Sequence, residues 1–189
     1  MGSLISQSRL NANALAAQPV VQGRQYLTFK VGSELFAIPI ENIREIIEFN
    51  GLTEIPMMPN FLRGVINLRG AVVPVIDLSA RFGRSPTEIS RRTCIVILEV
   101  MQDEHLLALG VMVDAVNEVL TVEPHQMEAR PSFGAKVRAE FIEGMISLGE
   151  RFVIALDIQQ VLAVTELASL IGVGSQEGGA LPAVAASSN

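Results

Sequence analysis

The 189-residue chain has few of the residues that build most enzyme and metal sites. It has one cysteine and two histidines, and it lacks tryptophan. The single cysteine, Cys94, excludes an internal disulfide and is typical of a reducing compartment. Neither His105 nor His125 has a second histidine or a cysteine at metal-ligand spacing. We therefore predict no metal site, no cofactor and no catalytic residues.

The sequence also lacks an excess of basic residues and a long apolar run. It has 14 lysines and arginines against 20 acidic residues, a formal net charge of −6. An acidic chain is a poor match for nucleic acid, because the phosphates are also negative. No run of about 18 apolar residues occurs, so we expect no membrane span. The N-terminus lacks the basic start and the long apolar core of a signal peptide.

Short apolar segments with strand periodicity are plentiful, and hydrophobic residues make up 49% of the chain. The segments "FLRGVINL" and "AVVPVIDL" predict two strands joined at Arg69–Gly70, and "TCIVILEV" with "HLLALGVMV" predicts a second hairpin. Pro74 has no backbone N–H, so it predicts an edge or bulge position. In the segment 41–47, isoleucines three and four positions apart predict a short helix.

An internal repeat organises the middle of the chain. The segment "GVINL" at 64–68 aligns without a gap to "GMISL" at 144–148, and the match continues through two aspartates. A second match precedes it, because "IREII" from Ile43 resembles "VNEVL" from Val116. Two matches in the same order predict two copies of one structural unit.

The two copies cover about 25–83 and 92–163, each with roughly five short strands and a short helix. A sheet of five short strands tends to close on itself, because closure removes its exposed edges. The flanking stretches 1–24 and 166–189 are rich in small and polar residues. They predict a flexible N-terminal arm and a flexible C-terminal tail.

The alignment of the copies also shows where they differ. Arg69 of the first copy aligns with Gly149 of the second, so folding alone does not require an arginine there. Asp77 and Asp157 are equivalent. They could form a catalytic carboxylate pair, but we expect each to cap the helical turn that follows it.

Three segments resemble the CheW family, which consists of coupling proteins of bacterial chemosensory arrays: "LTFKVGSELFAIPIENIREII", "FLRGVINLRGAVVPVIDL" and "GVMVDAVNEVL". The resemblance covers residues 25–165 in order. It implies a mainly β fold of two intertwined five-stranded SH3-like barrels with short helices. It also implies a non-catalytic adaptor that couples chemoreceptors to a CheA-type histidine kinase, in the cytoplasm at membrane-bound receptor arrays.

The resemblance also implies partners and site residues. The partners are the regulatory domain of the kinase, the cytoplasmic tip of methyl-accepting chemoreceptors, and other CheW-like domains. We expect Arg69 to pair with Glu45, because a guanidinium can bind a carboxylate bidentately. The expected receptor-binding groove contains Ile43, Glu45, Ile46, Gly64, Asn67, Arg69, Val116 and Val119. The expected kinase contacts are Phe49, Ile55, Met57 and Phe82.

Three other hypotheses fit parts of the sequence. The same barrels could form a ring-forming or peptide-binding scaffold that acts without a kinase. A hydrolase or metal enzyme on a barrel is a second alternative, and the scarcity of histidine and cysteine argues against it. An OB-like nucleic-acid binder is the third, and the acidic charge argues against it.

Overall fold

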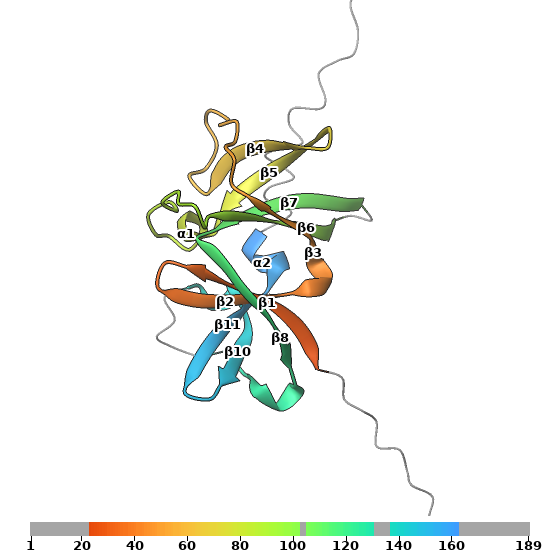
Figure 1. Ribbon diagram of the computed structural model, residues 1–189, viewed down its shortest axis with the longest axis vertical. Coiled ribbons are helices and arrows are strands. Elements are labelled where there is room, and N and C mark those ends of the chain that lie inside the picture. Colours follow the sequence, from red (N-terminus) through yellow and green to blue (C-terminus); the bar gives the residue numbers. More distant parts are fainter. Residues whose placement is uncertain (1–22, 103–104, 131–136, 163–189) are drawn as a thin grey trace, which may run out of the picture.

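The computed structural model describes residues 23–102, 105–130 and 137–162, which form two β-sheets with two short helices between them (Figure 1). The elements of the first copy are β1 (Arg24–Val31), β2 (Glu34–Pro39), η1 (Ile40–Asn42), β3 (Ile43–Glu48), β4 (Leu62–Leu68), β5 (Ala71–Asp77) and α1 (Leu78–Arg81). Those of the second copy are β6 (Cys94–Gln102), β7 (His105–Val113), β8 (Ala115–Val122), η2 (Pro124–Gln126), β9 (Met127–Glu128), η3 (Ala139–Phe141), β10 (Ile142–Leu148), β11 (Arg151–Leu156) and α2 (Ile158–Leu162).

The expected arm and tail lie outside the described residues, except that Arg24 already belongs to β1. Within the described part of the chain, no helix has the length and apolar character needed to cross a membrane.

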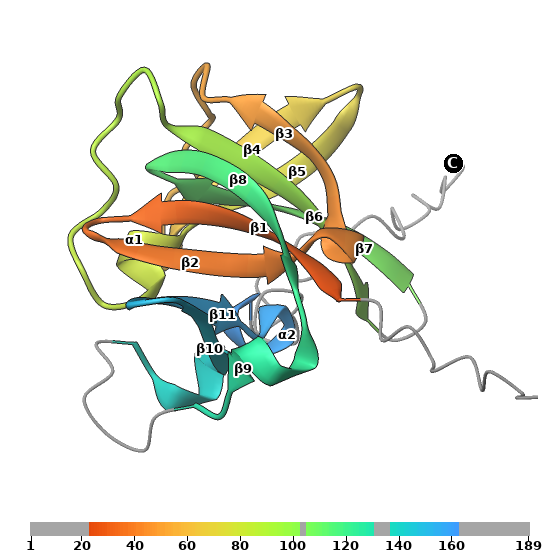
Figure 2. The ribbon, with the colours of Figure 1, turned by 60° about the horizontal axis from the view of Figure 1, so that its bottom comes forward.

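The two copies exchange their first hairpins. One sheet, barrel A, has the strand order β8-β1-β2-β11-β10-β9, which can be followed from top to bottom in Figure 2. The other, barrel B, has the order β3-β6-β7-β5-β4. The hairpin β1–β2 of the first copy thus lies among strands of the second, and β6–β7 lies among strands of the first. The predicted pair of intertwined SH3-like barrels is confirmed.

Three apolar clusters follow from this exchange. The largest lies between the barrels and is shared by both copies; its fully buried members include Phe29, Phe36, Leu98 and Leu109. Smaller clusters fill the interior of barrel A, around Tyr26 and Ile146, and of barrel B, around Val75, Ile95 and Ile97. Side chains alternate along a strand, so each hairpin strand supplies one face to the shared core and the other to its barrel interior.

The segment 41–47 is not the helix that we predicted. It consists of η1 followed by strand β3, which pairs antiparallel with β6. The register shifts between Ile43 and Glu45, so β3 contains a bulge. The extra residue places Ile43 and Ile46, three positions apart, on the same face, which imitates helical spacing. β-branched residues also favour the strand.

The two predicted hairpins are confirmed. Strands β4 and β5 are joined at Arg69 and Gly70, and β6 pairs with β7 along its whole length. Pro74 lies in the part of β5 that pairs with β4 alone, because pairing with β7 begins at Val75. Its partner in β4, Val65, uses both its N–H and its C=O to bond to Thr53 instead, so the missing N–H of proline breaks no ladder bond.

Both aspartates cap helices, as predicted. Asp77 is fully buried, and its carboxylate accepts hydrogen bonds from the backbone N–H groups of Ser79 and Ala80 in α1. Asp157 accepts from the N–H of Gln160 in α2 at 3.2 Å. Each carboxylate therefore has a structural role, which follows from its position directly before a helix.

Candidate protein-binding site

Four apolar residues predicted for the receptor groove lie on the faces that β3 and β8 turn toward the shared core. Ile46 pairs with Val96 and Val119 pairs with Leu27, and both partners belong to the shared cluster. Ile43 is half-buried against the same cluster. We call Ile43, Ile46, Val116 and Val119 the inter-barrel patch.

The patch has a half-buried floor and an exposed margin. Ile43 and Val116 pack against the shared core. Ile46 is 43% exposed and Val119 is 51% exposed, although both are large aliphatic side chains. Exposed aliphatic side chains on strand faces whose other residues pack against a core are typical of a surface that binds a partner.

Glu45 lies on the other face of β3. It pairs with Ile97, which belongs to the interior of barrel B, and so does its neighbour along this face, Ile47. Arg69 reaches it from the β4–β5 turn, and Arg69 Nη2 donates a hydrogen bond to Glu45 Oε2 at 2.9 Å. The predicted pair is therefore present. It joins β3 to β4–β5 behind the inter-barrel patch rather than lining that patch.

The turn that carries Arg69 is held in a conformation that favours glycine. Arg69 has φ 54° and Gly70 has φ 90°, and Asn67 Oδ1 accepts a hydrogen bond from Gly70 N at 2.9 Å. The equivalent residue Gly149 has φ 64°. A side chain in this region costs about 1 kcal/mol, so the arginine is the less stable choice for this turn.

Gly64 has a packing role. Its φ is 144°, and a Cβ on it would lie 2.1 Å from the carbonyl oxygen of Thr53. Thr53 and Val65 exchange two backbone hydrogen bonds of 2.8 Å beside it. Gly64 is thus a buried residue that lets the chain approach the edge of β4 closely.

The residues predicted to contact the kinase do not share one environment. Met57 is fully exposed at φ 62°, and Ile55 is half-buried nearby in the chain. Phe49 packs against the interior cluster of barrel B. Phe82 is 9% exposed in the shared core, with its ring centroid 5.0 Å from that of Phe36. Phe82 is therefore a core residue and does not belong to a contact surface.

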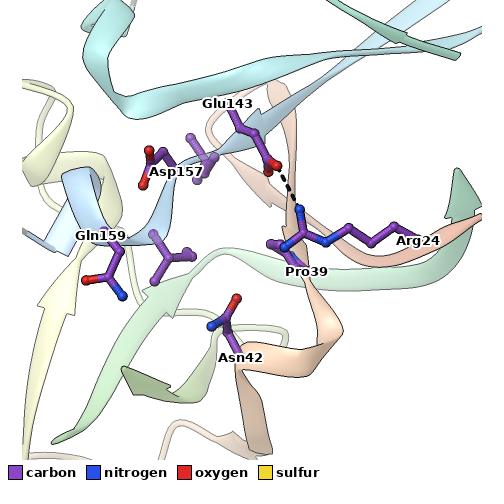
Figure 3. Close-up of a pocket in the computed structure, with 8 residues that line it drawn as sticks. Arg24, Pro39, Asn42, Glu143, Asp157 and Gln159 are labelled. Atoms are coloured by element: carbon purple, nitrogen blue, oxygen red, sulfur yellow. Dashed lines mark hydrogen bonds and ion pairs between the residues drawn. The ribbon is translucent and has the colours of Figure 1, made fainter. Parts of the chain in front are cut away.

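Sequence reasoning missed an ionic clasp at the start of β1, and Figure 3 shows its contact between Arg24 and Glu143. Arg24 Nε donates to Glu41 Oε1 at 2.7 Å, and Arg24 Nη1 donates to Glu143 Oε1 at 2.7 Å. The clasp joins β1, η1 and β10, beside a pocket of about 210 Å³. Glu143 lies 119 positions from Arg24, so no local pattern could have indicated the contact.

The charges of the clasp shift its pKa values. Burial acts to raise the pKa of Glu41, but the hydrogen bond from Arg24 and the Arg24 charge hold it below the ordinary 4.5. Burial acts to lower the pKa of Arg24, and its two carboxylates raise it overall. Burial and the charge of Glu143 raise the pKa of Tyr26, which Arg24 partly offsets.

A larger hollow, of about 590 Å³, opens between β3 and β4, the two edge strands of barrel B. Apolar side chains of Ile47, Leu52 and Ile66 line it together with polar groups. The outer edge of β4 pairs with Thr53 alone, whereas in barrel A the short strand β9 pairs with the equivalent edge of β10. Among the described residues, no group of three or more histidine, cysteine, aspartate or glutamate side chains could hold a metal ion there or elsewhere.

Known proteins resemble this chain in sequence. The family described as CheW-like domain matches residues 25–166. A chemotaxis protein CheW of Klebsiella aerogenes is 34% identical over 77% of this chain and 86% of its own length. A probable chemotaxis protein CheW of Rhizobium etli is 32% identical over 80% of this chain and 96% of its own.

A solved structure agrees with these relatives. The crystal structure of the scaffolding protein TtCheW from Thermoanaerobacter tengcongensis superposes with a TM-score of 0.66 at 29% identity. The match covers 74% of this chain and 92% of that one. The family match over residues 25–166, together with these relatives and this structure, shows that the chain belongs to the CheW family.

Proposed function

We propose that this chain is a non-catalytic adaptor that couples chemoreceptors to a CheA-type histidine kinase in a cytoplasmic chemosensory array. Family membership supports a scaffold role. The inter-barrel patch is the observation that carries the proposal, because it leaves aliphatic side chains exposed beside a core that both barrels share.

The inter-barrel patch is the proposed receptor site. Ile43 and Val116 provide an apolar floor, and Ile46 and Val119 provide an exposed margin on each barrel. An amphipathic helix binds such a surface by laying its apolar face into it. The cytoplasmic tip of a chemoreceptor, a helical hairpin, has the chemistry to do so.

The Glu45–Arg69 pair is proposed to position β3 for that contact. The carboxylate lies on the face of β3 opposite Ile46, and the guanidinium fixes it to the β4–β5 turn. The pair keeps β3 in place without touching a helix bound in the inter-barrel patch. Asn67 supports it by closing the turn with its hydrogen bond to Gly70 N.

The proposed kinase surface is the segment 49–61, between β3 and β4. Its most exposed apolar side chain, Met57, sits in a left-handed conformation after Pro56. Methionine adapts its shape to a partner, so an exposed one is suited to a protein contact. The regulatory domain of the kinase and other CheW-like domains are the proposed partners here.

Purified partners test the two surfaces separately. The double variant Ile46→Glu/Val119→Glu should weaken binding of a receptor cytoplasmic fragment by at least ~10-fold, because two charges enter an apolar contact. It should leave binding of the kinase regulatory domain unchanged. Met57→Glu should have the reverse effect. Val72→Glu is the control, because Val72 is 70% exposed on β5, outside both surfaces.

The outcomes separate the proposal from its alternative. Receptor binding that survives the double variant in a folded protein would remove the inter-barrel patch from the site. A wild-type protein that binds neither partner would favour the scaffold that acts without a kinase. Calorimetric titration measures each affinity, and circular dichroism checks that every variant is folded.

A further inference from the structure

A single arginine joins the two repeat copies where they meet between the barrels. Arg81 is the last residue of α1, and its Nε donates to the carbonyl oxygen of Val161 in α2 at 2.8 Å. Its guanidinium carbon lies 4.5 Å from the ring centroid of Phe61 and 5.2 Å from that of Phe141. One side chain therefore contacts α2, η3 and the segment before β4.

The contacts of Arg81 are equivalent positions of the repeat. Phe61 accepts a hydrogen bond from Asp77 N at 2.8 Å, and Phe141 accepts one from Asp157 N at 2.9 Å, both through their carbonyl oxygens. Val161 follows Asp157 by four residues, as Arg81 follows Asp77. Arg81 thus bonds to its own counterpart and lies between two equivalent rings, where the repeat axis passes.

The copies differ here in a way that fits one shared contact. The second copy has valine where the first has arginine. A second arginine would place a like charge beside the first in a partly buried site, which is unfavourable. One cation held against two aromatic faces serves both copies, because each ring attracts it through its quadrupole.

This contact lies on the opposite side of the shared core from the inter-barrel patch. In barrel B, β3 lies on one side of the β6–β7 hairpin and β5, which leads into α1, lies on the other. In barrel A, β8 and β11 flank β1–β2 in the same way, and α2 follows β11. Figure 1 shows both helices between the sheets.

Within residues 23–162, as far as the structure describes them, the chain crosses between the sheets only near the inter-barrel patch. It passes from barrel A to barrel B through η1 and returns through Asp114, and these crossings lead directly into β3 and β8. The helix side has no crossing of the described chain at Arg81. On that side non-covalent contacts join the barrels: those of Arg81, and those of Arg84, after α1, with the carbonyl oxygen of Val31 and the carboxylate of Glu34 in the β1–β2 hairpin.

We propose that Arg81 is a positioning residue that fixes the placement of the two barrels relative to each other, and so sets the spacing of β3 and β8. On the helix side, the guanidinium fixes the distances between Phe61, Phe141 and Val161. The two chain crossings fix the other side. Without the guanidinium, the barrels can tilt about the crossings, and the spacing of β3 and β8 varies.

A distance measurement between the barrels tests this without any partner. Nitroxide labels on cysteines at the exposed positions Glu48 in β3 and Thr121 in β8, in a Cys94→Ala background, report the spacing by pulsed electron resonance. Arg81→Met keeps the apolar stem and removes the guanidinium. It should broaden and shift the distance distribution relative to the wild-type background.

Arg138→Met is the matched control. Arg138 also lies over the ring of Phe141, at 5.7 Å, but its ion pair is with Glu140 in the same copy. It should leave the distribution unchanged. An unchanged distribution in folded Arg81→Met would overturn the proposal, and so would equal broadening by Arg138→Met. If Arg81→Met does not fold, Arg81→Gln takes its place, and the same outcomes decide.

A binding measurement adds the functional consequence, which rests on the proposed receptor site. Arg81→Met should weaken binding of the receptor fragment roughly fivefold to tenfold, and Arg138→Met should not. A broadened distribution with unchanged receptor binding would leave Arg81 as the positioning residue and count against the inter-barrel patch as the receptor site. The two failures are thereby distinguished.

Discussion

The two copies of the repeat share a strand order, apart from the short additional strand β9 of the second copy, and they differ at the turn after β4 and β10. Both turns contain a residue in the left-handed region, Arg69 at φ 54° and Gly149 at φ 64°. The second copy uses the residue that this conformation favours. Glu118, the counterpart of Glu45, is exposed, whereas Glu45 is held by Arg69.

The comparison teaches which features the fold itself requires. Hairpin exchange, helix-capping aspartates and the close approach at β4 and β10 occur in both copies. The ion pair at the turn and the aromatic contact of Arg81 each depend on an arginine of the first copy that the second copy lacks. The shared features stabilise the barrels, and equivalent positions of both copies also form the inter-barrel patch. The unshared features are the ones that we propose to position β3 and β8 for binding.

The largest expected effect separates two equivalent glycines. In Gly64→Ala the new Cβ would lie 2.1 Å from Thr53 O, at φ 144°. Neither the backbone oxygen nor the left-handed backbone can yield easily, so we expect a loss of about 3 kcal/mol or more in the free energy of unfolding. Urea unfolding measures it.

Gly144→Ala is the comparison variant. Its nearest contact would be the Sδ of Met127 at 2.6 Å, the end of a flexible side chain, although Glu128 O follows at 2.8 Å. We expect a smaller loss, of about 1–2 kcal/mol. Equal losses at the two glycines would show that the strained φ of Gly64 contributes little.

The next effect compares the two caps. Asp77 accepts hydrogen bonds from the N–H groups of Ser79 and Ala80, and from both the N–H and the hydroxyl of Thr87, all in a fully buried site. Asp77→Ala leaves these donors without their acceptor, and we expect a loss of about 3 kcal/mol. Asp157→Ala removes a part-exposed cap and should cost about 1 kcal/mol.

Thermal or urea unfolding of the two alanine variants checks this order. Asp77→Asn serves as a second reference, because it retains one carbonyl acceptor of similar size. If Asp157→Ala proves as costly as Asp77→Ala, burial of the cap is not what distinguishes the copies.

A smaller effect on stability is expected when the arginine of the first turn is replaced by the glycine that the second turn has. Arg69→Gly relieves the left-handed strain and removes an ion pair whose arginine is 71% exposed. These changes oppose each other, so the free energy of unfolding should stay within about 1 kcal/mol of wild type. Binding of the receptor fragment should nevertheless weaken, because β3 loses its tie to the turn.

Calorimetric titration of Arg69→Gly against the receptor fragment decides the role of the pair. Unchanged binding in this folded variant would remove Arg69 from the site. A charge exchange, Glu45→Arg with Arg69→Glu, sharpens the result: binding restored in the double variant, after losses in both single ones, identifies a direct pair.

Much of the fold could be predicted from the sequence. The gapless match of 64–68 with 144–148 indicated the repeat, and Asp77 and Asp157 marked the two helical turns. The helix predicted for the segment 41–47 was wrong for a physical reason. A bulge places Ile43 on the same face of β3 as Ile46. The spacing of apolar residues in one sequence cannot distinguish such a bulged strand from a helical turn.

The site was predicted less completely, because burial and face depend on pairing across the sheets. Arg69 and Glu45 were correctly paired, but the strand alternation that puts Glu45 behind the patch needs the register with β6. Phe82 looked like a contact residue, and it is core because α1 turns it toward Phe36. The contacts of Arg24 with Glu143 and of Arg81 with Val161 span 119 and 80 positions and have no local signature.

The smallest expected effect lies at the first strand of each copy. Strand β1 begins with Arg24, the centre of the clasp, whereas β6 begins with Cys94. The pKa of Glu41 is below its ordinary 4.5 in the folded protein, after the opposing effect of burial, because Arg24 bonds it. The clasp therefore contributes stability above pH 4.5 that is lost as the pH falls through the lowered pKa. Arg24 is 45% exposed and Glu41 51%, so the contribution is below about 1 kcal/mol. Arg24→Gln should lower stability slightly at pH 7 and flatten its decline between pH 5 and 3, measured by urea unfolding. If the free energy of unfolding of Arg24→Gln falls as steeply with pH as that of wild type, Glu41 is not the group whose protonation the clasp opposes. The loss of stability in acid would then come from features that both barrels share.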